Sequence, residues 1–269
     1  MKKKKKTVRI LIIVVVFLLL ENLFIGYRFS WGLFKSLGDI RMSKLPGNAP
    51  EYGMDKVERV AGNPLEGKKV LFLGSSVTYG ASSLREGIPE YFAARLGCEV
   101  TKEAVSGTTL TDNGSSSYVQ RLLNNADPQT PYSLVVVQLS TNDATKELPL
   151  GEIGESFDKD TFDTSTVTGA MEFIIAYAGE TWNCPVVFYT NARYDSEAYT
   201  AMVQRLKELQ DKWGIGVLDL WTSDDFNSIP DADRALYMND DIHPTKAGYR
   251  DWWCPVMEQQ LMEYLDSIG

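Results

Sequence analysis

Histidine and cysteine are scarce in this chain. Among its 269 residues there is one histidine, His243, and there are three cysteines, Cys98, Cys184 and Cys254. The cysteines form no Cys-x-x-Cys pair, so the usual sequence patterns of zinc sites and of thioredoxin-like redox sites are missing. Their odd number leaves at least one thiol unpaired within the chain. Since histidine is the side chain that most often titrates near neutral pH, acid/base catalysis of that kind would have to depend on His243.

The N-terminus lacks the small-residue Ala-x-Ala pattern at which signal peptides are cleaved. It begins with a basic run, Lys2 to Lys6 and Arg9, and continues with an unbroken apolar stretch from Ile10 to Leu20. We therefore expect residues 1–28 to be a single-pass membrane anchor, with secretion after signal cleavage as the alternative. The positive-inside rule would keep the basic run in the cytoplasm and place the rest of the chain outside the cell membrane.

Positive charge is also scarce beyond this N-terminal segment. Residues 1–28 hold seven of the 27 Lys and Arg residues and one of the 36 Asp and Glu residues, which leaves 20 basic and 35 acidic residues, a net charge of −15. Such an acidic surface repels nucleic acid, so we expect no nucleic-acid partner. The length suits one main domain with a substantial core, and no sequence pattern indicates an oligomeric state.

The rest of the chain divides into a linker and one domain. Residues 29–67 contain several Gly and Pro residues and little periodicity, which is typical of a tether with some local structure. In residues 68–269, short β-branched runs alternate with longer helical patterns, which indicates a three-layer α/β/α sandwich with a five-stranded parallel, flavodoxin-like sheet. The predicted strands are Lys69 to Leu73, Glu99 to Ala104, Leu134 to Leu139, Val186 to Thr190 and Gly216 to Leu220, and the predicted helices are 86–96, 115–126, 166–182, 196–213 and 245–268.

Small and polar residues follow the first three predicted strands. The first strand runs into a Gly-Ser-Ser sequence that ends at Ser76, the second is followed by Gly107, and the third is followed by Asn142. Each sequence alone is typical of an ordinary turn, and the glycine patterns of phosphate-binding loops are absent. In a parallel α/β sheet, however, the carboxyl ends of the strands share one edge, where ligands bind. A hydroxyl, a backbone N–H and an amide would meet there, and an Asp-x-x-His segment, Asp240 to His243, follows later in the chain.

These four segments resemble the signature blocks of the SGNH hydrolases, the GDSL-like lipase/acylhydrolase family, over roughly residues 68–265. The resemblance implies that Ser76 is the nucleophile and that Asp240 and His243 complete a catalytic triad. It also implies an oxyanion hole formed by the Ser76 backbone N–H with Gly107 and Asn142, and a reaction that needs no metal or organic cofactor.

The sequence departs from the family pattern at two positions. Ser75 stands where the family has Asp in Gly-Asp-Ser, and Ser140 stands where Gly-x-Asn-Asp is usual. Neither change removes a reacting group, although Ser140 could alter the direction of Asn142. The chemistry also follows from the residues: a serine hydroxyl needs a base within hydrogen-bond reach, and His243 is the one imidazole that the chain offers. Asp240 is preferred over the adjacent Asp241 as the group that orients it.

These features predict an extracytoplasmic serine esterase or acylhydrolase, a carboxylic ester hydrolase that acts through an acyl-enzyme on Ser76. Its expected substrates are acylated small molecules or glycans, including O-acyl groups on carbohydrate. One alternative is an acyltransferase that uses the same triad to acylate a surface glycan. Another is a surface binding domain that keeps the fold without catalysis.

Two further predictions concern the surroundings of the site. The acidic segment 145–163 is expected to cover the site as a loop, which would disfavour a strongly anionic substrate. Trp252 and Trp253 are expected to pack in the core, with stacking on the substrate as the alternative.

Overall fold

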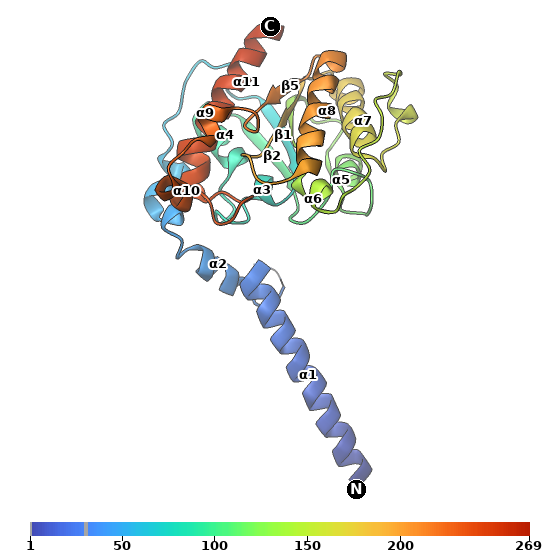
Figure 1. Ribbon diagram of the computed structural model, residues 1–269, viewed down its shortest axis with the longest axis vertical. Helices are drawn as coiled ribbons and strands as arrows, with labels where there is room; N and C mark the ends of the chain where they lie inside the picture. Colours follow the sequence, from blue (N-terminus) through green and yellow to red (C-terminus); the bar gives the residue numbers. More distant parts are fainter. Residues whose placement is uncertain (1, 30–31) are drawn as a thin grey trace.

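A five-stranded parallel sheet lies between two layers of helices (Figure 1). The computed structural model describes residues 2–29 and 32–269. The strands are β1 (Lys69–Gly74), β2 (Glu99–Ala104), β3 (Tyr132–Gln138), β4 (Val186–Tyr189) and β5 (Gly216–Leu218). Their order in the sheet is β2-β1-β3-β4-β5, and every pairing is parallel. This is the flavodoxin-like order, and the predicted fold class is confirmed.

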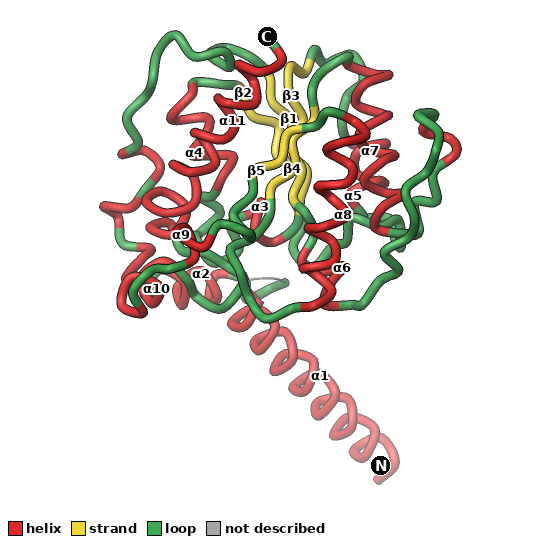
Figure 2. The backbone as a smooth tube through the Cα atoms, turned by 45° about the horizontal axis from the view of Figure 1, so that its top comes forward, coloured by secondary structure: helices red, strands yellow, loops and turns green. Residues whose placement is uncertain are grey.

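The longer helices form the two outer layers. Helices α4 and α11 cover one face of the sheet, and α5, α7 and α8 cover the other (Figures 1 and 2). The helices of the domain are α3 (Ser76–Tyr79), α4 (Ile88–Leu96), α5 (Tyr118–Asn125), α6 (Thr141–Thr145), α7 (Val167–Trp182), α8 (Glu197–Trp213), α9 (Asp224–Asn227), α10 (Asp231–Tyr237) and α11 (Cys254–Ile268). A π-helical turn, η5 (Gly248–Trp253), leads into α11, and a 3-10 turn, η4 (Lys159–Thr161), precedes α7. Each long predicted helix therefore has a counterpart in the structure.

Strand β3, at the centre of the sheet, contains a continuous apolar run. Leu134, Val135, Val136 and Val137 are all fully buried. Val135 and Val137 belong to the core beneath α5, α7 and α8, whereas Leu134 and Val136 belong to the core beneath α4 and α11. Because helices cover both faces of a parallel sheet, neither face of the strand needs polar side chains.

The two tryptophans of the C-terminal segment are part of the second core. Trp253 is fully buried, and Trp252 is buried and stacks on Phe226 with ring centroids 4.8 Å apart. The Trp252 indole N–H donates a 3.0 Å hydrogen bond to the Phe226 carbonyl. The prediction that both rings pack in the core is therefore confirmed.

The segment between the N-terminal helix and the domain has more structure than its composition suggested. It contains α2 (Ser36–Met42) and three short 3-10 turns, η1 (Pro46–Asn48), η2 (Pro50–Tyr52) and η3 (Met54–Lys56). Met54 and Leu65 are buried in the core beneath α4 and α11. Much of the predicted linker thus packs on the domain, because its few apolar side chains reach a core contributed by distant parts of the chain.

The N-terminal helix α1 (Lys2–Phe29) leaves the domain beside the edge where α3 and α6 lie (Figures 1 and 2). Its residues Arg9–Tyr27 form a stretch of 19 residues with a mean hydropathy of 2.6, of which 6% is buried. A helix of this length and composition suits either a membrane anchor or a signal sequence.

No residue of the acidic segment 145–163 lines the cavity at the strand ends, so the prediction that the segment covers the site is wrong, although Lys146 at its start donates a 3.4 Å hydrogen bond to the Gly107 carbonyl. It packs instead on α7 and α8. Lys212 of α8 donates 2.7 Å hydrogen bonds to the carbonyls of Gly154 and Ser156, and the Phe157 ring packs edge-on against Trp213. Apolar and cationic partners on these helices hold the segment there, and its acidic charge therefore gives no information about the substrate.

Candidate active site

Ser76 begins helix α3 directly after strand β1. The turn before it requires glycine, because a Cβ on Gly74 would lie 1.7 Å from the Thr78 hydroxyl oxygen. Gln138, at the end of the neighbouring strand β3, holds this turn from below. Its side-chain carbonyl accepts hydrogen bonds from the backbone N–H groups of Ser75 (2.9 Å) and Thr78 (3.2 Å). The serine is therefore presented from a fixed backbone.

A short loop before α11 carries Asp240 and His243. An isolated antiparallel bridge between Met238 and Pro244 closes this loop at its base. Within the loop, the Asp240 carboxylate accepts hydrogen bonds from the backbone N–H groups of Ile242 (3.0 Å) and His243 (2.8 Å). Asp240 thus fixes the backbone of the turn as well as facing the imidazole.

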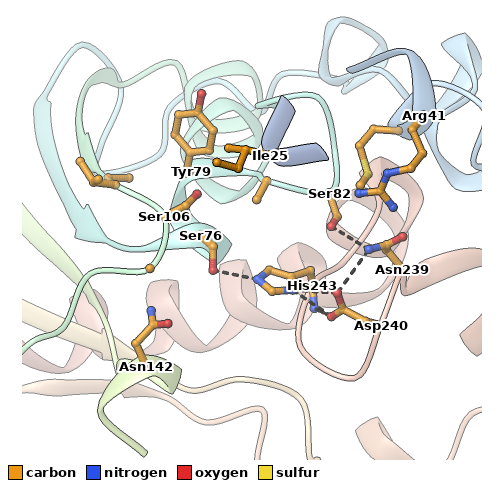
Figure 3. A pocket seen from close by; sticks show the side chains of 15 residues that line it. Ile25, Arg41, Ser76, Tyr79, Ser82, Ser106, Asn142, Asn239, Asp240 and His243 are labelled. Atoms are coloured by element: carbon orange, nitrogen blue, oxygen red, sulfur yellow. Dashed lines mark hydrogen bonds and ion pairs between the residues drawn. The ribbon is translucent and has the colours of Figure 1, made fainter. Parts of the chain in front are cut away.

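The structure brings Ser76, His243 and Asp240 together in one line (Figure 3). Ser76 Oγ lies 2.8 Å from His243 Nε2, and His243 Nδ1 lies 2.8 Å from Asp240 Oδ1 and 3.0 Å from Oδ2. Ser76 and His243 are 167 positions apart in the chain. Side chains that were grouped from sequence alone are therefore within direct hydrogen-bond reach. The adjacent Asp241 is exposed, as Asp240 is, but among the described residues it makes no hydrogen bond or ion pair with His243.

The ionisation of Asp240 determines which imidazole nitrogen carries the proton. Burial raises the pKa of Asp240. The hydrogen bond and charge of His243, together with the two backbone N–H groups, lower it by more, so that the pKa is about 2. An ionised carboxylate can only accept, so Nδ1 of a neutral His243 donates to it. The Nε2 atom is then the acceptor and faces the Ser76 hydroxyl, which is the arrangement that a general base requires.

Three hydrogen-bond donors lie near the Ser76 hydroxyl. Among the described residues, the backbone N–H groups of Ser76 and Gly107 make no hydrogen bond. Gly107 has φ of +81°, a left-handed conformation that glycine adopts without strain. Asn142 in α6 donates a 2.9 Å hydrogen bond from Nδ2 to the Thr108 carbonyl, which orients its amide along the cavity wall (Figure 3). Ser76, Gly107 and Asn142 all line one cavity.

The two departures from the family pattern leave this geometry intact. Ser140 is the N-cap of α6, and its hydroxyl accepts a 3.4 Å hydrogen bond from the Asp143 backbone N–H. Ser75 is fully buried beneath the site, and its backbone N–H donates a 2.9 Å hydrogen bond to the Gln138 side-chain carbonyl. Both serines therefore serve the turns that carry Ser76 and Asn142.

Buried charged residues join the strand ends to one another. The Asp143 carboxylate accepts hydrogen bonds from the backbone N–H groups of Leu110 (2.7 Å) and Thr111 (3.0 Å). Arg121 of α5 donates a 2.7 Å hydrogen bond to the Gly74 carbonyl and one of 3.3 Å to the Thr108 hydroxyl. These positioning contacts and the contacts of Gln138 were not predicted from the sequence.

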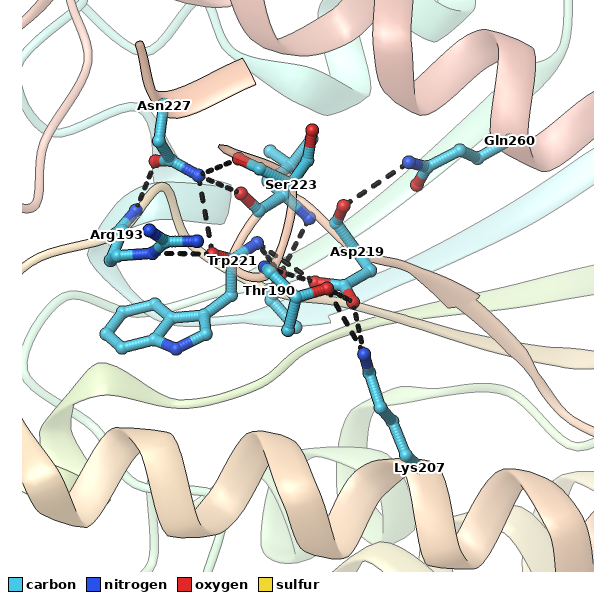
Figure 4. Close-up of polar contacts among 10 residues, drawn as sticks. Thr190, Arg193, Lys207, Asp219, Trp221, Ser223, Asn227 and Gln260 are labelled. Carbon is cyan, nitrogen blue, oxygen red and sulfur yellow. Dashed lines mark hydrogen bonds and ion pairs between the residues drawn. The ribbon is translucent and has the colours of Figure 1, made fainter. Parts of the chain in front are cut away.

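A polar network links the carboxyl ends of β4 and β5 (Figure 4). The Thr190 hydroxyl accepts from the backbone N–H groups of Leu220 (2.9 Å) and Trp221 (3.0 Å). The next residue, Asn191, donates a 3.0 Å hydrogen bond from Nδ2 to the Ile242 carbonyl. The residue before His243 is therefore tied to the end of β4. The polar pair Thr190–Asn191 at the end of a predicted strand was the sequence signal that could have indicated a role at this edge of the sheet.

The candidate site lies in a cavity of about 630 Å³. Ser76, Asn142, Asp240 and His243 form its polar part. Its other lining residues are Ile25, Arg41, Met42, Tyr79, Ala81, Ser82, Ala104, Val105, Ser106, Gly107 and Asn239. Among the described residues, no group of three or more His, Cys, Asp or Glu side chains is placed to hold a metal ion.

Solved structures from several bacteria share this fold. A protein from Lactobacillus plantarum is 22% identical, with a TM-score of 0.57 over 75% of this chain and 98% of that one. A GDSL-like lipase from Bacteroides ovatus is 15% identical, with a TM-score of 0.53 over 75% of this chain and 99% of that one. A family two carbohydrate esterase from Clostridium thermocellum, solved with cellohexaose, is 19% identical, with a TM-score of 0.51 over 77% of this chain and 66% of that one.

The sequence comparison is more specific than these structural likenesses. No curated protein sequence matches the chain. The GDSL-like lipase/acylhydrolase family, in contrast, matches residues 72–250, which include all the residues of the Ser76, Gly107, Asn142 and His243 segments. Because this match covers well over half of the chain, the protein belongs to the GDSL-like lipase/acylhydrolase family of SGNH hydrolases.

Proposed function

We propose that the protein is a serine ester hydrolase whose catalytic residues are Ser76, His243 and Asp240. The observation that carries this proposal is the pair of 2.8 Å contacts that His243 makes, through Nε2 to the Ser76 hydroxyl and through Nδ1 to Asp240. A weak nucleophile, its base and the group that orients the base are thus joined by a chain of hydrogen bonds.

The proposed reaction has two steps. His243 Nε2 accepts the Ser76 proton as Oγ forms a bond to the acyl carbon, and the ester C–O bond breaks as the alcohol leaves with that proton. Water then attacks the acyl-enzyme with His243 again as base, which releases the acid and restores Ser76. Asp240 stays ionised throughout, because its pKa is held at about 2.

The oxyanion formed in each step needs donors aimed at it. We assign this role to the backbone N–H groups of Ser76 and Gly107 and to the Asn142 side-chain amide, which line the same cavity. Each such donor contributes on the order of 3 kcal/mol to transition-state stabilisation. Asn142 keeps one amide hydrogen on Thr108, and its second amide hydrogen serves the oxyanion.

We further propose that α1 is a membrane anchor and that the domain lies outside the cytoplasm. The apolar stretch Arg9–Tyr27 is long enough to span, its side chains are largely exposed, and five consecutive lysines precede it. The proposed substrates are acylated small molecules or glycans. The Clostridium thermocellum esterase that shares the fold was solved with an oligosaccharide, cellohexaose, which makes O-acylated glycans reasonable substrates to assay.

Labelling with a fluorophosphonate, which reacts with activated serines, tests the proposal. We expect wild type to be labelled and the Ser76→Ala variant to remain unlabelled, while Ser106→Ala, a neighbouring serine of the same cavity, keeps the label. Ester hydrolysis should release free acid even when glycan acceptors are added. Equal absence of label from wild type and Ser76→Ala would instead favour a binding domain, and transfer to the acceptor would favour an acyltransferase.

A further inference from the structure

Ile25 belongs to two features that the sequence keeps far apart. It lies within the apolar stretch Arg9–Tyr27 of α1, and it also lines the cavity that contains Ser76 (Figure 3). A helix rises 1.5 Å per residue, so Ile25 is only about 3 Å along the axis from the end of that stretch at Tyr27. If α1 spans a bilayer, the cavity lies where the helix leaves it.

The cavity wall near α1 combines the apolar side chains of Ile25 and Met42 with Arg41, whose Nε donates a 3.1 Å hydrogen bond to the Tyr27 carbonyl of that helix. Val105, which is 42% exposed although its side chain is apolar, also lines the cavity. The polar catalytic groups Ser76 and His243 line the same cavity. An ester could therefore place its apolar part against the wall formed with α1 and α2 while its carbonyl faces Ser76.

Specific contacts fix this wall to the domain. Asp39 of α2 forms a bidentate ion pair with Arg85, with contacts of 2.9, 3.1 and 3.2 Å. Asn48, which is buried, donates hydrogen bonds to the carbonyls of Met42 (2.9 Å) and Ser82 (2.7 Å) and accepts one from the Lys246 backbone N–H (2.9 Å). Met42, Ser82 and Lys246 come from three separate parts of the chain. Residues 36–48 are therefore held in place beside the loop that carries Asp240 and His243.

The edge of the sheet that carries the site also faces the N-terminal helix. Helices α3 and α6, which follow the carboxyl ends of β1 and β3, lie on the side of the domain from which α1 leaves (Figures 1 and 2). A bilayer around α1 would thus lie on the same side of the domain as the cavity. The cavity would then be level with the interfacial region of the bilayer, where the polar parts of membrane amphiphiles are found.

We propose that the end of the anchor helix forms part of the substrate site, so that the enzyme takes its esters from the membrane surface. The substrate class is an acylated amphiphile whose apolar part lies in the outer leaflet and contacts Ile25 and Met42. This inference rests on the proposed serine esterase function, and the bonds made and broken are those of that reaction. The anchor is then a determinant of specificity in addition to being a tether.

The test uses the full chain in lipid vesicles and one chromogenic ester, a coumarin butyrate, in two forms. One form is free in water, and the other is linked to a lipid in the same vesicles. We expect Ile25→Ala to lower kcat/KM for the lipid-linked form about tenfold, because it removes apolar contact with the substrate. The matched control is Ile12→Ala, which makes the same change on α1 at an exposed position that does not line the cavity. It should behave as wild type.

A second pair of variants separates docking from simple tethering. Asp39→Arg removes the ion pair between Asp39 and Arg85 and puts two positive charges side by side, but it leaves α1 attached to the domain. We expect it to lower kcat/KM for the lipid-linked ester about fivefold or more while the soluble ester is turned over as before. The double variant Asp39→Arg/Arg85→Asp, which restores opposite charges, should recover most of this loss.

The outcomes distinguish the two proposals. Turnover of the soluble ester, with Ile25→Ala equal to Ile12→Ala and Asp39→Arg equal to wild type on the lipid-linked ester, would overturn the inference and leave the esterase function standing. Absence of turnover of both esters, with no fluorophosphonate label on Ser76, would overturn the esterase function and the inference with it.

Discussion

The Gln138 side-chain carbonyl accepts a 2.9 Å hydrogen bond from the backbone N–H of Ser75, the residue before the proposed nucleophile. The same oxygen accepts from the Thr78 backbone N–H at 3.2 Å and from the Thr78 hydroxyl at 3.0 Å. One fully buried amide at the end of β3 thus holds both ends of the turn that presents Ser76. The position of the proposed nucleophile therefore depends on a residue that does not line the cavity.

This relationship predicts the effect of Gln138→Met, a change that keeps the length of the side chain and removes the acceptor. Two buried backbone N–H groups would lose their partner, which should cost about 1–3 kcal/mol of unfolding free energy, measured by urea denaturation. Displacement of Ser76 should also lower kcat by about tenfold. Gln129→Met, at an exposed position, is the control. Unchanged kcat and stability in Gln138→Met would show that the turn is held by other contacts.

Asn142→Ala tests the oxyanion site. We expect kcat to fall roughly a hundredfold or more, while KM stays within about twofold, because the lost donor acts on charge that exists only in the transition state. Steady-state kinetics with a short-chain ester measure both constants. Asn124→Ala, at an exposed position of α5, should leave them unchanged. A rise in KM with an unchanged kcat would assign Asn142 to ground-state binding instead.

The adjacent aspartates provide a matched pair for the triad. Asp240→Asn should lower kcat about a thousandfold, because an amide can no longer hold the imidazole in the tautomer that accepts from Ser76. Asp241→Asn changes an exposed neighbour and should have little effect. Equal losses in both variants would mean that the loop, rather than the carboxylate, was affected.

The depressed pKa of Asp240 gives a pH prediction. Because the folded-state pKa is about 2 and the ordinary value is 3.8, the ionised carboxylate stabilises the fold above pH 4. That contribution is lost as the pH falls through the folded-state pKa. The difference in unfolding free energy between wild type and Asp240→Asn should therefore shrink as the pH falls from about 4 to 2. A difference that stays constant down to pH 2 would contradict the assigned interaction.

Local sequence patterns were sufficient to predict the sheet and the proximity of the proposed site residues at its edge. The strand β3 is a run of Val and Leu residues, and a parallel sheet buries such runs on both faces. Ser76, Gly107 and Asn142 stand immediately after strands, so the topology of the sheet brings them to one edge. Their roles in catalysis remain proposals, but their proximity could be predicted because it needs only strand order.

The positions that the sequence analysis missed depend on contacts between distant segments. Gln138 and Asn191 hold the serine turn and the histidine loop through hydrogen bonds to residues 63 and 51 positions away, and local sequence patterns do not identify such distant partners. The linker prediction was incomplete for the same reason, since Asn48 is ordered by bonds to Ser82 and to Lys246, 198 positions away. The position of segment 145–163 was predicted incorrectly because it depends on hydrogen bonds from Lys212 of α8. The sequence predicted this helix but not its contacts with the segment.

The most direct test of the account is ester turnover by His243→Ala. The substitution removes the one imidazole of the chain while leaving Ser76, the oxyanion donors and the fold, which near-UV circular dichroism and thermal unfolding would verify. We expect the hydrolysis of a short-chain ester to fall to the background rate in a protein that remains folded, because no other side chain can accept the Ser76 proton at neutral pH. Turnover at the wild-type rate by folded His243→Ala would contradict the proposed catalytic mechanism.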